Sequence, residues 1–246
     1  MADLLEMTGR AEATHFWFRG FRAFVAPAIE EIAAGRRDLR LIDCGCGTGN
    51  NLSLLKPYGR VFGFDLTTEG AHRARRTERP IVQANIERIP YQAEAFDIAT
   101  SFDVLQSVPD DRAALREMAR ILKPGGHAIL NVTAFEFMRA DHAEVWNELR
   151  RYTPASAGRL IGDSGLQVVR ISFLFASVFP MMLAARMWQK MLRPFRELEG
   201  DSDLEVPAEP LNTALTWLVE REAALSRRIP MPIGSSLLIV AKKPGA

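Results

Sequence analysis

The sequence is poor in cysteine and has no long uninterrupted run of apolar residues. Its two cysteines, Cys44 and Cys46, are too close together for an ordinary disulfide and have no metal-spaced partners elsewhere. The residues after Met1 lack the basic stretch and apolar run that open a signal peptide. These absences predict a cytoplasmic, reduced protein without a metal centre.

Net charge is nearly absent as well. Lysine and arginine together number 31 and aspartate and glutamate 30, which leaves a formal charge of +1. A protein that binds nucleic acid without sequence preference depends on a basic surface, so this balance argues against a nucleic-acid partner. The length and the apolar content suit one α/β domain with a substantial core.

Glycine is concentrated at one point, where a strand is expected to pass into a helix. Residues 41–50 read Leu-Ile-Asp-Cys-Gly-Cys-Gly-Thr-Gly-Asn. Three glycines follow the acidic Asp43 on alternate positions: Gly45, Gly47 and Gly49. Such a loop at the carboxyl end of a parallel strand is typical of a small-molecule cradle. The dinucleotide fingerprint needs a sixth-place glycine, which here is Asn50, so a nicotinamide-dependent oxidoreductase is disfavoured.

Further segments follow in a consistent order. A strand at 61–65 ends in Asp65, the next expected strand at 80–86 carries Asn85, a fourth begins at Phe96, and Leu-Lys-Pro-Gly-Gly at 122–126 leads into a fifth at 127–132. From Leu41 to Val132 the chain resembles the class I S-adenosylmethionine-dependent methyltransferases. The resemblance implies an α/β fold: a doubly wound, Rossmann-like, seven-stranded sheet with an antiparallel last strand.

The resemblance also implies the cofactor, S-adenosylmethionine, and residues that bind it. Asp43 suits its cationic amino-acid moiety, Asp65 its ribose, and Asn85 with Ile86 its adenine. Many relatives carry Asp where this chain has Asn85, but an amide oxygen can still accept a hydrogen bond from the adenine amine. The full expected set is Arg19, Asp43, Gly45, Gly47, Gly49, Asp65, Leu66, Asn85, Ile86 and Phe102.

We expect a single domain over residues 1–246, with a helical cap at 1–37 and a core at 38–174 plus 234–246. Aromatic and small apolar residues recur at helical spacing from Phe16 to Ile29. Two roles stay open for them: packing this helix onto the sheet, or capping the cofactor with Trp17 and Arg19. His-Phe-Trp-Phe at 15–18 resembles one methyltransferase subgroup, which favours the cap.

A helical insertion, residues 175–233, is expected between strands six and seven. The apolar segment 173–192 contains Pro180 and Arg186, so it is too short and too broken to span a bilayer. Three roles stay open: a lid over the substrate, a homodimer contact, or a peripheral element that meets a membrane or a lipid.

The acceptor side resembles the same subgroup less closely. His142 matches a histidine of its pattern and Glu148 replaces another, so these two are the candidate catalytic residues. The expected acceptor-binding residues are Trp17, Arg150, Arg151 and Tyr152. The loop after the fourth strand lacks the Asn/Asp-Pro-Pro-aromatic motif of base-amino methyltransferases. The chain is therefore expected to methylate an oxygen or nitrogen of a small, partly apolar molecule, with a lipid-linked metabolite among the options. The alternative is a non-catalytic S-adenosylmethionine-binding module that activates a partner.

Overall fold

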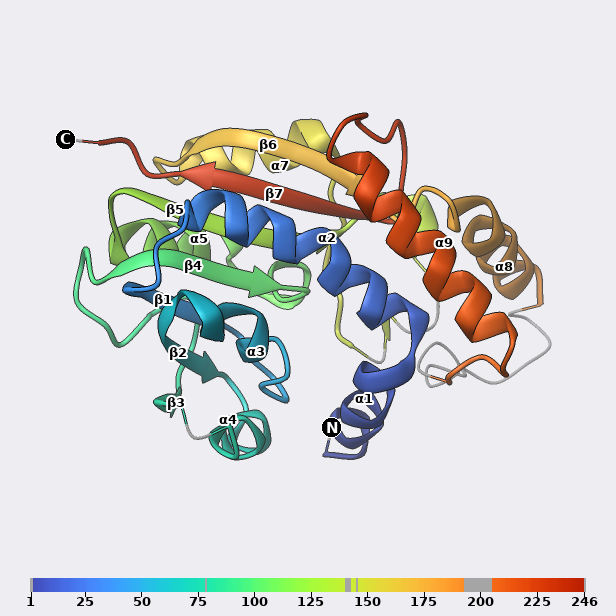
Figure 1. The fold of residues 1–246 in the computed structure, drawn as a ribbon, viewed down its shortest axis with the longest axis horizontal. Helices are drawn as coiled ribbons and strands as arrows, with labels where there is room; N and C mark the ends of the chain where they lie inside the picture. The colour runs from blue at the N-terminus through green and yellow to red at the C-terminus, as the bar shows by residue number, and fades with distance from the viewer. Residues whose placement is uncertain (1, 78, 140–142, 145, 193–204, 246) are drawn as a thin grey trace.

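One mixed sheet organises the structure, a computed structural model that describes residues 2–77, 79–139, 143–144, 146–192 and 205–245. In this part of the chain the sheet has seven strands in the order β3-β2-β1-β4-β5-β7-β6, and β7 is antiparallel to both of its neighbours (Figure 1). The strands are β1 (Leu39–Cys44), β2 (Gly59–Asp65), β3 (Ile81–Gln83), β4 (Phe96–Phe102), β5 (Leu122–Thr133), β6 (Gln167–Leu174) and β7 (Ser236–Lys242). The expected doubly wound fold is confirmed.

Helices cover both faces of the sheet (Figure 1). They are α1 (Ala2–Thr14), α2 (Phe16–Ala33), α3 (Leu52–Leu55), α4 (Thr68–Arg75), α5 (Asp111–Ile121), α7 (Pro154–Asp163), α8 (Phe179–Leu192) and α9 (Leu211–Ser226), with short 3-10 turns η1 (Lys56–Tyr58), η2 (Leu105–Ser107) and η3 (Glu136–Met138). Side chains of β1 alternate between the two resulting cores: Leu41 packs with α2, α3, α4 and α9, and Ile42 packs with α5 and α7. Burial of both faces is what a parallel strand requires.

Capping residues set the starts of two helices as the sequence predicts. Asp110 accepts a hydrogen bond from the amide of Ala113 at the start of α5. Thr153 and Ser156 form a reciprocal capping box at the start of α7, and Pro154 is the first residue of that helix. Both arrangements satisfy amides that a helix N-terminus leaves without intrahelical partners.

Three element boundaries differ from the sequence-based expectation. The helix after the glycine loop is a single turn, because Pro57 has no amide hydrogen with which to continue the helical hydrogen bonds, and the chain continues as η1. The third strand is shorter than residues 80–86 and ends at Gln83. Residues 122–126, expected as a turn, already pair with β4 as an irregular first part of β5: Leu122 lies opposite Phe96, and the register shifts before His127.

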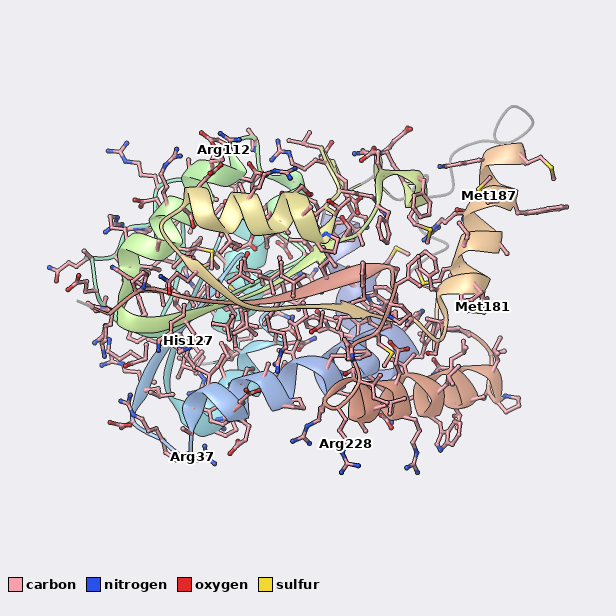
Figure 2. The ribbon with its side chains drawn as sticks, turned by 90° about the horizontal axis from the view of Figure 1, so that it is seen from above. Arg37, Arg112, His127, Met181, Met187 and Arg228 are labelled. Atoms are coloured by element: carbon pink, nitrogen blue, oxygen red, sulfur yellow. The ribbon has the colours of Figure 1, made fainter. Side chains whose placement is uncertain are left out.

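The insertion between β6 and β7 contains α8 and α9. Helix α9 packs along α2, and Glu222 fixes it to the start of the insertion by accepting hydrogen bonds from the amides of Ala176 and Ser177. Helix α8 lies at the edge of the molecule, where Met181 and Met187 lie away from the sheet (Figure 2). Within the described residues, no helix combines the length and the apolar character needed to cross a bilayer.

The contact between α2 and α9 depends on the absence of a side chain at Gly20. A Cβ built there would lie 2.2 Å from Cγ1 of Val219. Because valine is stiff about χ1, Val219 cannot move aside and the helices would have to separate. We expect Gly20→Ala to lower the free energy of unfolding by about 1–3 kcal/mol in urea titrations, the usual cost of overpacking.

Gly158→Ala is the matched control, since Gly158 lies inside α7 and its added Cβ would only touch Ile171 at 3.8 Å. That variant should gain roughly 0.5–1 kcal/mol from helix propensity. Equal destabilisation by both substitutions would contradict the packing explanation.

Candidate functional site

The glycine loop lies at the carboxyl end of β1, where the strand order places β2 on one side and β4 on the other. In an open α/β sheet, ligands bind at such a point because the connecting helices depart to opposite faces. A Cβ at Gly45 would lie 2.5 Å from Val104, and one at Gly49 would lie 2.9 Å from Cα of Ala74. These two glycines permit close packing of the loop against the protein.

Gly47 has a different surrounding. Its φ is +48°, and a Cβ built there would meet no protein atom within 4 Å. The missing side chain therefore faces open space on the ligand side of the loop rather than a neighbouring element. A cradle that one methyl group would begin to fill fits a ligand that approaches the backbone closely.

Asp65, at the end of β2, is fixed beside this cradle. Its Oδ2 accepts a hydrogen bond from the amide of Gly47 at 2.9 Å. Its Oδ1 accepts from the amide and the hydroxyl of Thr67 at 2.9 and 2.7 Å. A carboxylate has about four acceptor sites, so these contacts orient Asp65 and leave capacity for a ribose hydroxyl.

Asp43 lies below the loop and is buried, with 2% of its surface exposed. Its Oδ1 accepts a hydrogen bond from Oγ1 of Thr100 at 2.7 Å. Burial raises the pKa of Asp43 to about 7, and the nearby charge of Asp65 acts in the same direction. A cation bound above the loop would favour the ionised form. The buried carboxyl therefore fits the ammonium group of an amino-acid moiety.

The expected adenine side is partly open. Leu66 is 63% exposed although it is apolar, whereas Ile86 is buried. Asn85 is exposed, and its side-chain oxygen accepts a hydrogen bond from the amide of Glu87 at 2.8 Å. Phe102, at the end of β4, is buried edge-on against Phe21 with ring centroids 5.1 Å apart.

The N-terminal residues expected at the cofactor make other contacts. Arg19 forms an ion pair with Glu220 of α9 at 3.2 Å. Trp17 stacks on Phe175, with ring centroids 3.6 Å apart. The aromatic stripe thus packs α2 against the sheet and the insertion, the first of the two roles left open by the sequence.

Helix α1 supplies a contact with the glycine loop that the sequence did not suggest. Glu12 is buried and accepts hydrogen bonds from Oγ1 of Thr48, at 2.7 Å, and from Nδ2 of Asn50. Burial raises the pKa of Glu12 above its ordinary value, and the two hydrogen bonds oppose that rise. No local motif around Glu12 could have identified this long-range contact.

Arg150 and Tyr152 hold the segment that follows β4. Arg150 donates hydrogen bonds to the carbonyl oxygens of Val108 and Pro109, at 2.6 and 2.9 Å, and forms an ion pair with Asp111 at 3.3 Å. The hydroxyl of Tyr152 donates to Oδ2 of Asp111 at 2.9 Å. Burial and the Asp111 charge raise the pKa of Tyr152. These contacts stabilise the wall of the site.

Glu148 and Arg151 form a buried ion pair, with 2.8 Å between Oε2 and Nη2 and about 5% of either side chain exposed. Arg139 donates a further hydrogen bond to the Glu148 carbonyl oxygen. A guanidinium at this distance favours the charged form of a carboxylate. His142, the other candidate catalytic residue, lies outside the described residues.

Asp103 is a site residue that the sequence analysis missed. It follows β4 directly, has φ +55°, and accepts hydrogen bonds from Nδ2 of Asn131 at 2.8 Å and from Nε2 of Gln106 at 3.4 Å. Solvent reaches this residue, yet the protein atoms crowded around its carboxyl raise its pKa to about 6, and the charge of Glu148 contributes. The sequence feature that could have identified Asp103 is its position directly after a strand that ends beside the glycine loop.

A metal centre has no support in the described part of the chain, which holds no group of three or more histidine, cysteine or acidic side chains able to share an ion. Cys44 and Cys46 are free and buried, and burial raises the pKa of both thiols. A thiol kept protonated is a poor nucleophile and a poor ligand. Their small side chains fit the crowded turn.

Comparisons with known proteins agree with this geometry. Residues 42–130 match the family model described as a methyltransferase domain. The chain is 32% identical over 121 residues to the malonyl-[acyl-carrier protein] O-methyltransferase of Salmonella typhimurium, covering 48% of each chain. It is also 32% identical over 111 residues to a ubiquinone biosynthesis O-methyltransferase of Cronobacter sakazakii, covering 42% of this chain and 46% of that one. The chain thus spans about half the length of these curated relatives.

Among solved structures, a chain from the complex that contains the Haloferax volcanii Trm112 methyltransferase activator superposes with a TM-score of 0.61. The alignment is 22% identical and covers 96% of this chain and 93% of that one. The fold is therefore the Rossmann-like fold of these methyltransferase structures, and residues 42–130 are the part of the chain that matches the family model.

The open space at Gly47 generates a first test of the site. Gly47→Ala should weaken S-adenosylhomocysteine binding roughly tenfold or more in calorimetric titrations, because the new methyl group enters the cradle. Gly35→Ala is the control: Gly35 also has positive φ and open space, but it lies at the amino end of β1. Both variants carry the same backbone cost of about 1–2 kcal/mol. Equal loss of affinity in both would contradict a ligand at Gly47.

The buried Asp43 generates a second test. Since its folded-state pKa is raised from 3.8 to about 7, its contribution to stability is present at low pH and is lost as the pH rises through 7. Asp43→Asn cannot ionise and still accepts the Thr100 hydrogen bond. In urea titrations without ligand, the variant should gain about 2 kcal/mol over the wild type between pH 5 and pH 8. Parallel pH dependences of the two proteins would rule out this account of Asp43.

Proposed function

We propose that this protein transfers the methyl group of S-adenosylmethionine to an oxygen or nitrogen of a small, partly apolar acceptor. The observation that carries the proposal is the open space at Gly47, whose amide donates a hydrogen bond to Asp65, in a glycine loop that follows the buried Asp43 and matches a methyltransferase-domain model. Two carboxyl groups and an unobstructed loop backbone suit a ligand with hydroxyls at one end and an ammonium at the other.

In this proposal each group has a distinct task. Asp65 accepts hydrogen bonds from the ribose hydroxyls, and Asp43 supplies negative charge below the ammonium. Leu66 and Ile86 contact the adenine ring, and Asn85 accepts a hydrogen bond from its amine. Bound S-adenosylmethionine supplies an electrophilic methyl group, so the protein mainly orients the reactants, excludes water and removes a proton from the acceptor.

The partly apolar character of the acceptor has two supports. Several relatives are named for methylation in quinone pathways, namely ubiquinone biosynthesis, ubiquinone/menaquinone biosynthesis and the methylation of demethylmenaquinone. The exposed face of α8 is also apolar, with Met181, Met187, Trp188 and Met191 each about half exposed or more, while Arg186 on the same helix is buried. We therefore propose that α8 and α9 form a lid whose edge meets the acceptor's apolar tail.

The cofactor is tested by titration with S-adenosylmethionine, S-adenosylhomocysteine and NADH. The first two should bind and NADH should not; binding of NADH alone would refute the proposal.

For the acceptor, methyl-labelled S-adenosylmethionine is incubated with the protein and an extract of the source cells, which is then split into lipid and aqueous pools. We expect label in the lipid pool. Cofactor binding without transfer to either pool would instead identify the chain as a non-catalytic module that activates a partner.

A further inference from the structure

Asp103 lies at the carboxyl end of β4, the strand that neighbours β1 and its glycine loop in the sheet. It follows the last residue of β4, and the next residue, Val104, packs against the glycine loop at the position where Gly45 lacks a side chain. The Asp103 amide donates a hydrogen bond to the carbonyl oxygen of Asn131 at 3.0 Å, which fixes its backbone in a left-handed conformation. A non-glycine residue in that region is uncommon, and such strain is concentrated at functional sites.

Two buried amides orient the carboxylate of Asp103. Asn131 on β5 is 1% exposed and Gln106 in η2 is 3% exposed, and each directs its NH₂ group to the same oxygen, Oδ1. In the described part of the chain, their own side-chain oxygens accept no hydrogen bond. Burying two such oxygens is costly. The arrangement holds Oδ1 in place, and among the described residues no protein group donates a hydrogen bond to Oδ2 of Asp103.

The charged groups near Asp103 give the carboxyl groups of Asp103 and Glu148 different surroundings. Glu148 forms a buried ion pair with Arg151, whose pKa is lowered by burial and by the nearby charges of Arg186 and Arg139. The fixed negative charge of Glu148 opposes ionisation of Asp103, and the charge of Arg151 favours it. Two neighbouring carboxyl groups with different proton affinities are typical of a site that does acid–base chemistry.

We infer that Asp103 is the base that takes the proton of the acceptor, and that Glu148, which the sequence suggested for catalysis, is a positioning residue. This inference rests on the proposed methyl transfer. As the lone pair of the acceptor oxygen or nitrogen forms a bond to the methyl carbon, the carbon–sulfur bond breaks and its electrons go to sulfur. The acceptor proton moves to Oδ2 of Asp103. The sulfonium charge and the carboxylate charge disappear together, so the step is balanced.

The experiment measures the rate of label transfer to the extract pool that the wild-type protein methylates, as a function of pH. The wild type should lose activity on the acid side with a midpoint near 6, the pKa of Asp103. Asp103→Asn should be slower by a factor of about 100 or more, as expected for loss of a general base, and should lack that acid limb. Asp103→Glu should restore part of the rate and a limb. Asp163→Asn, on the exposed end of α7, is the matched control and should behave as the wild type.

The outcomes separate this inference from the proposed function. If no pool accepts label from the wild type, the proposed function fails. If transfer occurs and Asp103→Asn keeps both its rate and its acid limb, or the limb disappears only in His142→Ala, the inference is overturned and the methyltransferase stands. All variants are first shown to bind S-adenosylhomocysteine.

A second measurement needs no acceptor. Carbon NMR of the aspartate side-chain carboxyls, with S-adenosylhomocysteine bound, should show one resonance that titrates near pH 6 and is absent from Asp103→Asn. In Glu148→Gln its midpoint should move to lower pH, because a neighbouring negative charge has been removed. Titration of that resonance in the ordinary range, below about 4.5, would show that the surroundings do not raise the proton affinity of Asp103 as a base for the acceptor requires. That result would overturn the inference.

Discussion

The packing of Val104 against the glycine loop is the contact on which the rest of the site depends. Because Gly45 has no Cβ, the segment after β4 can approach the loop after β1, and the two strand ends form one surface. The loop carries the contacts expected for a cofactor, and the segment after β4 carries Asp103 and the residues that Arg150 and Tyr152 hold in place. A larger residue at position 45 would separate two groups that must act on the same bond.

Local patterns predict the elements of this fold well. Local sequence is sufficient to predict strand β1, the α5 cap at Asp110 and the start of α7 at Thr153, because each depends on residues close together in the chain. The expected helix after the glycine loop shortens to the single turn α3, which Pro57 follows within two residues. The last two strands, β6 and β7, lie on either side of the long insertion, as the resemblance implies.

Contacts between distant segments explain what the sequence could not provide. Glu148 and Arg151 are only three residues apart, but the burial that turns them into a buried ion pair depends on the surrounding fold. Asp103 depends on an asparagine 28 residues away and on a backbone angle that no motif encodes. Arg19 was expected at the cofactor, yet its charge is paired with Glu220, about two hundred residues later in the chain.

The contact of Glu12 with Thr48 and Asn50 joins the loop that grips the ligand to the first helix of the described chain. Glu12 is buried, so separating the loop from α1 would leave its carboxyl group without these partners in a place that water hardly reaches. Displacement of the loop and displacement of α1 are therefore energetically coupled. In the proposed function, a ligand that orders the loop would also order a helix that it does not need to touch.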